Sequence, residues 1–151
     1  MVKLSDLLGR TDVKDLAVGT ISIGDVYLMQ MDESNGIHPA AGYATRRKFF
    51  VVLGFDDVFI YGGIVINSKV NMNIRGQILA LHLPLSSKKY PFLSYDSFAD
   101  CLRLKTADVR EFEGWSYMGQ IDDEDLEKIK SNITSSPLET KERLRMFHLI
   151  A

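Results

Sequence analysis

The basic segment Thr45-Arg46-Arg47-Lys48 is the strongest candidate for a catalytic site in the sequence. It stands where a loop containing glycine and proline gives way to segment 48–53, which is rich in aromatic and β-branched residues and typical of a strand buried on both faces. An arginine at that boundary is held by a rigid sheet, and its planar guanidinium group suits a phosphate. Cleavage of a phosphodiester needs such a fixed cation close to the developing charge. The alternative interpretation is that these residues only solvate the start of a strand.

A polar pair, Asn67-Ser68, follows the apolar residues 64–66 and forms the second candidate site. The asparagine can donate hydrogen bonds to a phosphate, but only the serine has a hydroxyl group that could take part in proton transfer. Because side chains alternate along a strand, a slip of one residue changes which of the two shares a face with the arginines. The pair is also an ordinary turn sequence.

The loop 32–45 and its boundary supply candidates for substrate binding, namely His38, Tyr43 and Lys48. Histidine can act as an acid or base near neutral pH, and a tyrosine beside the arginines could stack on a base of single-stranded RNA. Both residues could equally be plain loop residues. His82 is expected on a strand face, and His148 is expected to be structural or exposed. No histidine pair has metal-ligand spacing with a carboxylate, so we predict no metal site and no cofactor.

The composition of the 151-residue chain is that of one globular domain, with 46% hydrophobic and 25% charged residues. Its net charge of -2 gives no overall basic field, so nucleic-acid binding needs a local patch. The single cysteine, Cys101, excludes an internal disulfide and is expected to be a small buried hydrophobic residue. The sequence has no apolar core of signal-peptide length, and no apolar run approaches the roughly 20 residues of a membrane span. We therefore expect a cytoplasmic protein that does not associate with a membrane.

Short apolar segments separated by turns predict a mainly β protein with helices at its C-terminal end. The expected architecture is a small, strongly bent barrel in a single domain, 1–151. An N-terminal arm, 1–20, is expected to include a short helical turn over 3–8. Strands are expected over 23–30, 48–53, 58–61, 64–66, 78–83 and 98–104, with Gly62-Gly63 causing a bend and Pro84 ending the fifth of them.

Two helices are predicted within the helical C-terminal segment, 121–151. Asp122 or Asp123 can cap the first, 122–133, whose apolar stripe contains Leu126, Ile129 and Ile133. We expect this helix to be scaffold, because its clustered carboxylates would repel RNA phosphates. Pro137 suits the first turn of the second helix, whose inward residues are expected to be Leu138, Leu144, Phe147 and Ile150.

Two runs near the C-terminus carry a resemblance to a known family. The first run reads SFADCLRLKT, and its matching positions are Ser97, Phe98, Ala99, Cys101, Leu104, Lys105 and Thr106. The second reads GQIDDEDL, and its matching positions are Gly119, Ile121, Asp123, Glu124, Asp125 and Leu126. In this order and spacing the runs resemble the last strand and terminal helix of the MazF/PemK-like toxins. The resemblance implies an SH3-like barrel of about five to seven strands with a C-terminal helix.

The family resemblance also implies a function. It implies a toxin-like endoribonuclease that cleaves single-stranded RNA without a metal, forms a homodimer and is regulated by an antitoxin. Strand alignment puts Arg47 at the family's catalytic arginine, with Arg46 as a near alternative, and puts Asn67 at its hydroxyl residue, with Ser68 one step beyond. Lys48 replaces a proline of that pattern. Because of the departures at Lys48 and Asn67, the alternative is a non-catalytic barrel that binds DNA, RNA or a protein.

Overall fold

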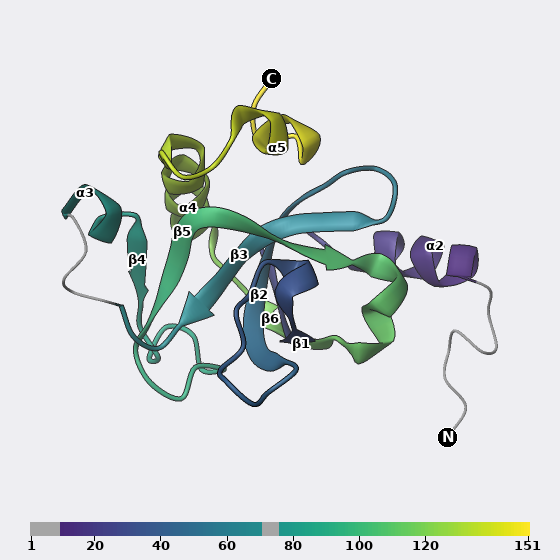
Figure 1. The fold of residues 1–151 in the computed structure, drawn as a ribbon, viewed down its shortest axis with the longest axis horizontal. Coiled ribbons are helices and arrows are strands. Elements are labelled where there is room, and N and C mark those ends of the chain that lie inside the picture. Colours follow the sequence, from purple (N-terminus) through teal and green to yellow (C-terminus); the bar gives the residue numbers. More distant parts are fainter. Residues whose placement is uncertain (1–9, 71–75) are drawn as a thin grey trace.

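The computed structural model describes residues 10–70 and 76–151, with the side chains of 10–14 excepted. A six-stranded antiparallel sheet forms its centre, in the order β4-β5-β3-β2-β1-β6 (Figure 1). The strands are β1 (Asp25–Met31), β2 (Arg46–Phe55), β3 (Ile60–Asn67), β4 (His82–Leu85), β5 (Ser97–Asp108) and β6 (Ser116–Gln120). The helices are α2 (Arg10–Thr20), η1 (Glu33–Asn35), α3 (Gly76–Leu79), η2 (Val109–Gly114), α4 (Asp123–Ser135) and α5 (Lys141–Met146). This mainly β architecture confirms the predicted fold class.

Irregularities in strand pairing curl the sheet into a half-barrel. The register shifts between Val52 and Gly54 where β2 pairs with β3, and between Gly63 and Val65 where β3 pairs with β5. An added Cβ at Gly63 would lie 1.9 Å from the carbonyl oxygen of Val51, so only glycine fits at this close approach. The Gly62-Gly63 bend predicted from the sequence is therefore confirmed.

Several predicted strand boundaries were wrong. Segment 78–83 was expected to be one strand, but its first part belongs to α3 and only its end enters β4. Pro84 lies inside β4 instead of ending it, which an edge strand tolerates because one side of its backbone needs no partner. Residues 58 and 59 form a turn instead of a strand, and the Asp56 carboxylate accepts hydrogen bonds from the backbone N–H groups of residues 58–60.

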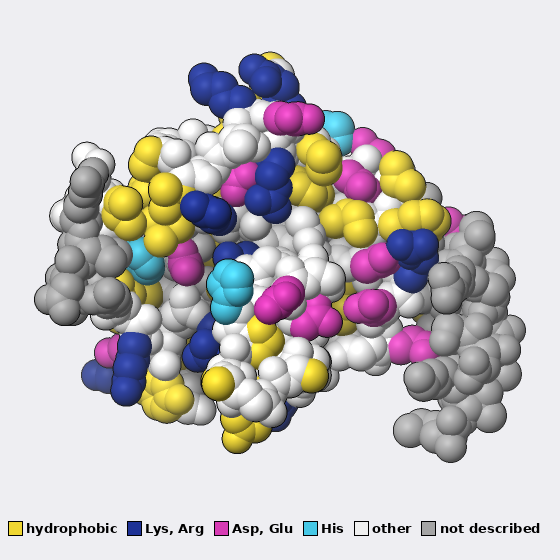
Figure 2. Space-filling model, in the orientation of Figure 1, with side chains coloured by type: hydrophobic (Ala, Val, Ile, Leu, Met, Phe, Trp, Pro, Cys, Tyr) yellow, Lys and Arg dark blue, Asp and Glu magenta, His cyan; other side chains and the backbone are white. Residues whose placement is uncertain are grey.

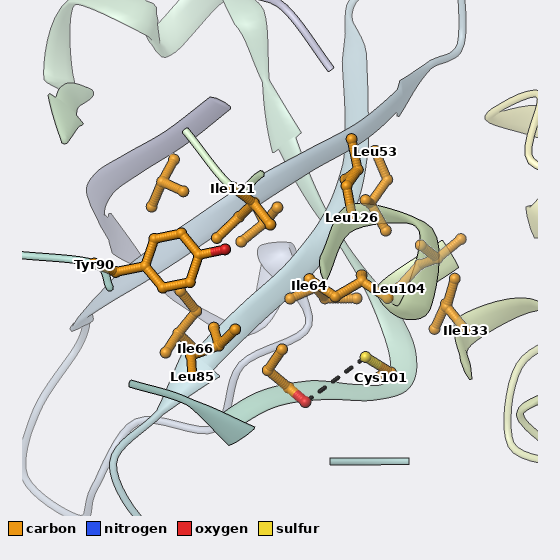
Figure 3. Packing of buried hydrophobic residues seen from close by; sticks show 14 of the residues in the cluster. Leu53, Ile64, Ile66, Leu85, Tyr90, Cys101, Leu104, Ile121, Leu126 and Ile133 are labelled. Carbon is orange, nitrogen blue, oxygen red and sulfur yellow. Dashed lines mark hydrogen bonds between the residues drawn. The ribbon is translucent and has the colours of Figure 1, made fainter. Parts of the chain in front are cut away.

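One face of the sheet packs on α4 and α5 (Figure 3). The predicted stripe of Leu126, Ile129 and Ile133 is buried there, and the Asp122 carboxylate caps α4 by accepting from the N–H of Asp125 at 2.8 Å. Cys101 is buried in the same core, where burial raises the pKa of its thiol to about 12. Helix and cysteine both match the sequence predictions.

The last helix begins later than predicted. Thr140, and not Pro137, precedes its first turn and caps it by accepting a hydrogen bond from the Arg143 N–H. Leu144 and Phe147 are buried as expected and Ile150 packs against the core, but Leu138 is exposed. Phe147 lies directly on Gly54 and Gly62, where any Cβ would collide with it.

The opposite face of the sheet carries a second core, which includes Met29, Phe50, Val65 and Ala107. Helix α2 lies beside η2 next to this core and buries Ala17 there, so residues 10–20 of the predicted arm are helical. The turn predicted over 3–8 lies outside the described residues. No helix within 10–70 and 76–151 is long and apolar enough to cross a membrane.

Candidate functional site

A cleft of about 240 Å³ lies where the start of β2 meets the end of β3. Two loop residues before β5, Ser94 and Tyr95, also line it. The cleft is lined by Leu28, Arg46, Arg47, Lys48, Phe49, Ile66, Ser68, Leu93, Ser94, Tyr95 and Ser97. Four of the residues singled out from the sequence, Arg46, Arg47, Lys48 and Ser68, therefore meet at one place.

The pairing of β1 with β2 sets the direction of Arg47. Its Cα partner is Gln30, and the partner of Phe49 is Leu28. Residues opposite each other in an antiparallel pair share a face, so Arg47 projects on the same side as Phe49 and Leu28, which line the cleft. The Thr45 hydroxyl hydrogen bonds the Gln30 side-chain oxygen at 2.9 Å, tying the start of β2 to β1. Arg47 itself is exposed and its guanidinium is accessible to an anion.

Asn67, the last residue of β3, and Ser68, which directly follows it, have different surroundings. Ser68 lines the cleft together with Ile66 and Arg47, whereas Asn67 is absent from the cleft lining. The Asn67 side chain instead accepts a hydrogen bond from the Lys48 ammonium and donates one to the Asp100 carboxylate at 3.2 Å. Of the two predicted candidates, Ser68 is therefore the one that shares the cleft with the arginine.

Lys48 is a buried cation, with only 7% of its surface exposed. Burial, assisted by the charge of Arg46 and opposed by that of Asp100, lowers the pKa of Lys48 to about 8. The ammonium group is still mostly protonated at neutral pH, but it loses its charge at a lower pH than an ordinary lysine does. The positive charge at this end of β2 thus depends on pH.

The polar network continues through Asp100 to the edge strand. The His82 imidazole Nε2 lies 3.9 Å from the Asp100 carboxylate, and its Nδ1 lies 3.1 Å from the Ile78 carbonyl oxygen. Lys105, on the same strand as Asp100, donates to the Gly36 carbonyl at 3.0 Å, and burial lowers its pKa. Neither Asp100 nor Lys105 was among the site residues predicted from the sequence. They are two of the four charged residues of β5, and charged side chains among the apolar residues of a central strand were the signal that could have identified them.

The loop 32–45 is fixed in its first half. The Asn35 side chain donates to the Thr106 carbonyl at 2.8 Å, and Ile37 is buried. His38 and Tyr43 follow in the exposed half of the loop, and neither lines the cleft. The structure therefore does not bring these two candidates into contact with Arg47.

The acidic start of α4 lies away from the cleft lining. Its Asp122 and Asp125 carboxylates are bound by the Lys89 ammonium at 2.5 and 3.0 Å, and Tyr90 donates to Asp125 at 2.5 Å. No group of three or more His, Cys, Asp or Glu side chains that could hold a metal ion occurs among the described residues.

Comparison with known proteins gives a likeness in structure. No protein-family model matches the sequence, and no curated protein is similar to it. A chain in the crystal structure of MazE-MazF (Form-III) from Deinococcus radiodurans superposes with a TM-score of 0.53 at 12% identity, covering 76% of this chain and 94% of that one. A chain in Form-II of MazE-MazF from the same organism superposes with a TM-score of 0.54 at 12% identity, covering 76% of this chain and 93% of that one.

The chain has a MazF-like fold. This confirms the fold that the two C-terminal runs implied. At 12% identity the likeness concerns the fold, while the activity has to be argued from the side chains of the cleft.

Proposed function

We propose that this MazF-like chain is a toxin-like endoribonuclease that cleaves single-stranded RNA without a metal ion. The observation that carries the proposal is the cleft that joins Arg46 and Arg47 to the Ser68 hydroxyl. A guanidinium group held at the start of a strand is suited to stabilise the charge that develops on a phosphate during cleavage. The MazF-like fold supports the same assignment.

The proposed roles follow from the positions of the side chains. Arg47 stabilises the transition state and Ser68 orients the scissile phosphate, with Arg46 as the second cation of the cleft. Lys48 adds positive charge, and Asn67 holds its ammonium group instead of contacting RNA. His38 and Tyr43 approach the RNA from the exposed half of the loop, where Tyr43, 73% exposed, can stack on an unpaired base.

A protein partner is part of the proposal. The similar crystal structures are MazE-MazF complexes, and this pairing supports regulation of the present chain by an antitoxin in the cytoplasm. Strands β4 and β6 are the two edges of the sheet, and such edges favour association with another chain. We infer that the functional form is a homodimer.

The decisive experiment is cleavage of a mixed RNA pool in the presence of EDTA. Removing one preorganised donor from a site of this kind costs about 10²–10³-fold in rate, so Arg47→Ala should reduce cleavage by that factor. Arg103→Ala, which removes an exposed arginine outside the cleft, is the matched control and should cleave like the wild type. Equal activity of Arg47→Ala and the wild type, or no cleavage by the folded wild type, would refute the assignment.

A non-catalytic module that binds nucleic acid or protein is the second candidate. The bond between Lys48 and Asn67 favours it, because both side chains are engaged with each other at the place where a catalytic residue is expected. Expression in a host without an antitoxin separates the two functions. Growth arrest that Arg47→Ala relieves supports the ribonuclease, whereas harmless expression of the folded protein supports the module.

A further inference from the structure

A second cavity, of about 450 Å³, opens at the other end of β1. Its residues come from two parts of the chain that are far apart in the sequence: the segment from the end of α2 into β1, and the segment from η2 through β6. It is lined by Thr20, Ser22, Asp25, Tyr27, Phe112, Trp115, Tyr117 and Gln120. We refer to it as the aromatic pocket. None of these residues belongs to the cleft described above.

Four aromatic rings form the walls of the aromatic pocket. The Tyr27 ring lies 5.6 Å from both Trp115 and Tyr117, and Phe112 lies 5.5 Å from Trp115 at an interplanar angle of 83°. Tyr27 is buried, but Tyr117 is 60% exposed. The rings thus line a pocket that is open to the solvent at Tyr117, and ring faces attract cations.

Asp25 lies in the aromatic pocket and is 4% exposed. Its Oδ2 accepts hydrogen bonds from the Ser22 N–H at 2.8 Å and the Tyr27 hydroxyl at 3.3 Å, and its Oδ1 accepts from the Gln120 amide at 3.1 Å. All three donors are neutral, and none of the ion pairs among the described residues involves Asp25. A buried carboxylate is normally compensated by a cation, so this one is suited to receive a cation from outside.

The Asp25 carboxylate has room for a further donor. An ionised carboxylate offers about four acceptor positions, and Oδ1 receives a single hydrogen bond within the described part of the chain, from the exposed Gln120. Burial and the nearby Asp25 charge raise the pKa of Tyr27, so its hydroxyl group stays a neutral donor that fixes Oδ2. An incoming group could therefore bond to Oδ1.

The surroundings of the aromatic pocket are acidic. Glu111 and Glu113 flank Phe112 on η2 and are both exposed. Figure 2 shows Asp and Glu side chains gathered over the end of β5 and η2. The nearest cation in sequence, Arg110, is bound by the Asp108 carboxylate at 2.6 Å and lies over the Phe59 ring. These charges disfavour a nucleotide phosphate and favour a cation.

We propose that the aromatic pocket binds the side chain of an arginine presented by a protein partner. The planar guanidinium group can stack on the rings of Trp115 and Tyr117 while it donates to Oδ1 of Asp25, and a compact ammonium group can satisfy only one of these two interactions well. The site is separate from the cleft, so it does not depend on ribonuclease activity.

Trp115 is the only tryptophan of the chain, and its fluorescence reports directly on the aromatic pocket. The probe is N-acetylarginine methylamide, titrated into the full chain alongside the citrulline analogue, which has nearly the same shape without the charge. We expect a saturable change in fluorescence for arginine and an affinity at least tenfold lower for citrulline. Equal responses to both probes, or no saturable response to arginine, would overturn the proposal. A stronger response to uridine monophosphate would also overturn it, because it would indicate a nucleotide site.

Two variants test the named contacts. Asp25→Asn and Tyr117→Ala should each weaken arginine binding at least tenfold, because the first removes the charge and the second removes an exposed ring. Tyr95→Ala, in which a similarly exposed tyrosine is lost from the cleft, should bind arginine like the wild type. If Asp25→Asn fails to fold, Tyr117→Ala still decides, since that side chain is mostly exposed. Unchanged affinity of folded Tyr117→Ala for the arginine probe would refute the proposal that the aromatic pocket binds arginine.

Discussion

The cleft and the aromatic pocket occupy opposite ends of β1. Gln30, which pairs with Arg47, and Asp25, in the aromatic pocket, are five residues apart and thus separated by about 17 Å. The cleft shares a face with Phe49, whereas the aromatic pocket shares a face with Tyr27 and the second core. One region gathers cations for an anionic ligand, and the other holds a buried carboxylate among rings. A single strand thus connects two regions of opposite charge, and our proposals assign a separate ligand to each.

The largest effect that would sharpen this comparison is expected at Ser68. Ser68→Ala removes the hydroxyl group that lies in the cleft directly after β3, and it should slow RNA cleavage by about 10²-fold. Asn67→Ala, outside the cleft lining, should slow it by less than about tenfold, because it releases Lys48 and Asp100 without removing a group from the cleft. Cleavage rates of both variants in EDTA check this. The reverse order would show that Asn67 is the residue that faces the RNA.

The next effect concerns the core beneath the cleft. Leu126→Ala should lower the free energy of unfolding by about 2–4 kcal/mol, as truncation of a buried leucine does. Leu126 lies in the α4 core, and Trp115 packs against the core of the opposite face. Denaturation followed by circular dichroism and by Trp115 fluorescence should give coincident transitions. Separate transitions would show that the two cores unfold independently of each other.

A smaller effect is expected at Lys48, which is a buried cation, whereas Asp25 of the aromatic pocket is a buried carboxylate. The pKa of Lys48 is about 8 in the folded protein and 10.5 ordinarily, so the unfolded state binds more protons between these values. Stability of the wild type should therefore rise with pH from about 8 to about 10.5. Lys48→Met should be more stable than the wild type by about 1–2 kcal/mol at pH 7, and this advantage should vanish by about pH 10.5. Urea denaturation at several pH values measures it, and an advantage that persists at high pH would contradict the assigned cause.

The smallest effect is expected at the acidic start of α4. Asp123→Asn combined with Glu124→Gln should leave RNA affinity unchanged or slightly raised, because both side chains are exposed outside the cleft. Binding of a non-cleaved RNA analogue to the double variant provides the measurement. A large loss of affinity in the folded variant would place the RNA path across α4 instead of across the start of β2.

The sequence by itself determined the parts of this protein whose signals are local. The apolar runs that became β1, β2 and the C-terminal half of β3 are unbroken, and the cap and stripe of α4 lie within one short segment. The basic segment at the start of β2 could be identified for the same reason, because its residues are consecutive in the sequence. Only pairing and packing decided the rest. Strand β6, Ser116–Gln120, was not predicted because it lacks an apolar alternation and forms through its hydrogen bonds to β1.

The sites themselves show the same division. The sequence named Asn67 and Ser68 but left open which one joins Arg47, since that depends on the register of β3 in the curled sheet. The aromatic pocket had no sequence signal at all. Tyr27 lies in β1, whereas Phe112, Trp115 and Gln120 lie in the distant stretch from η2 to β6, and Asp25 becomes a buried carboxylate only when this stretch closes around β1. Long-range contacts create that environment, and no local pattern encodes it.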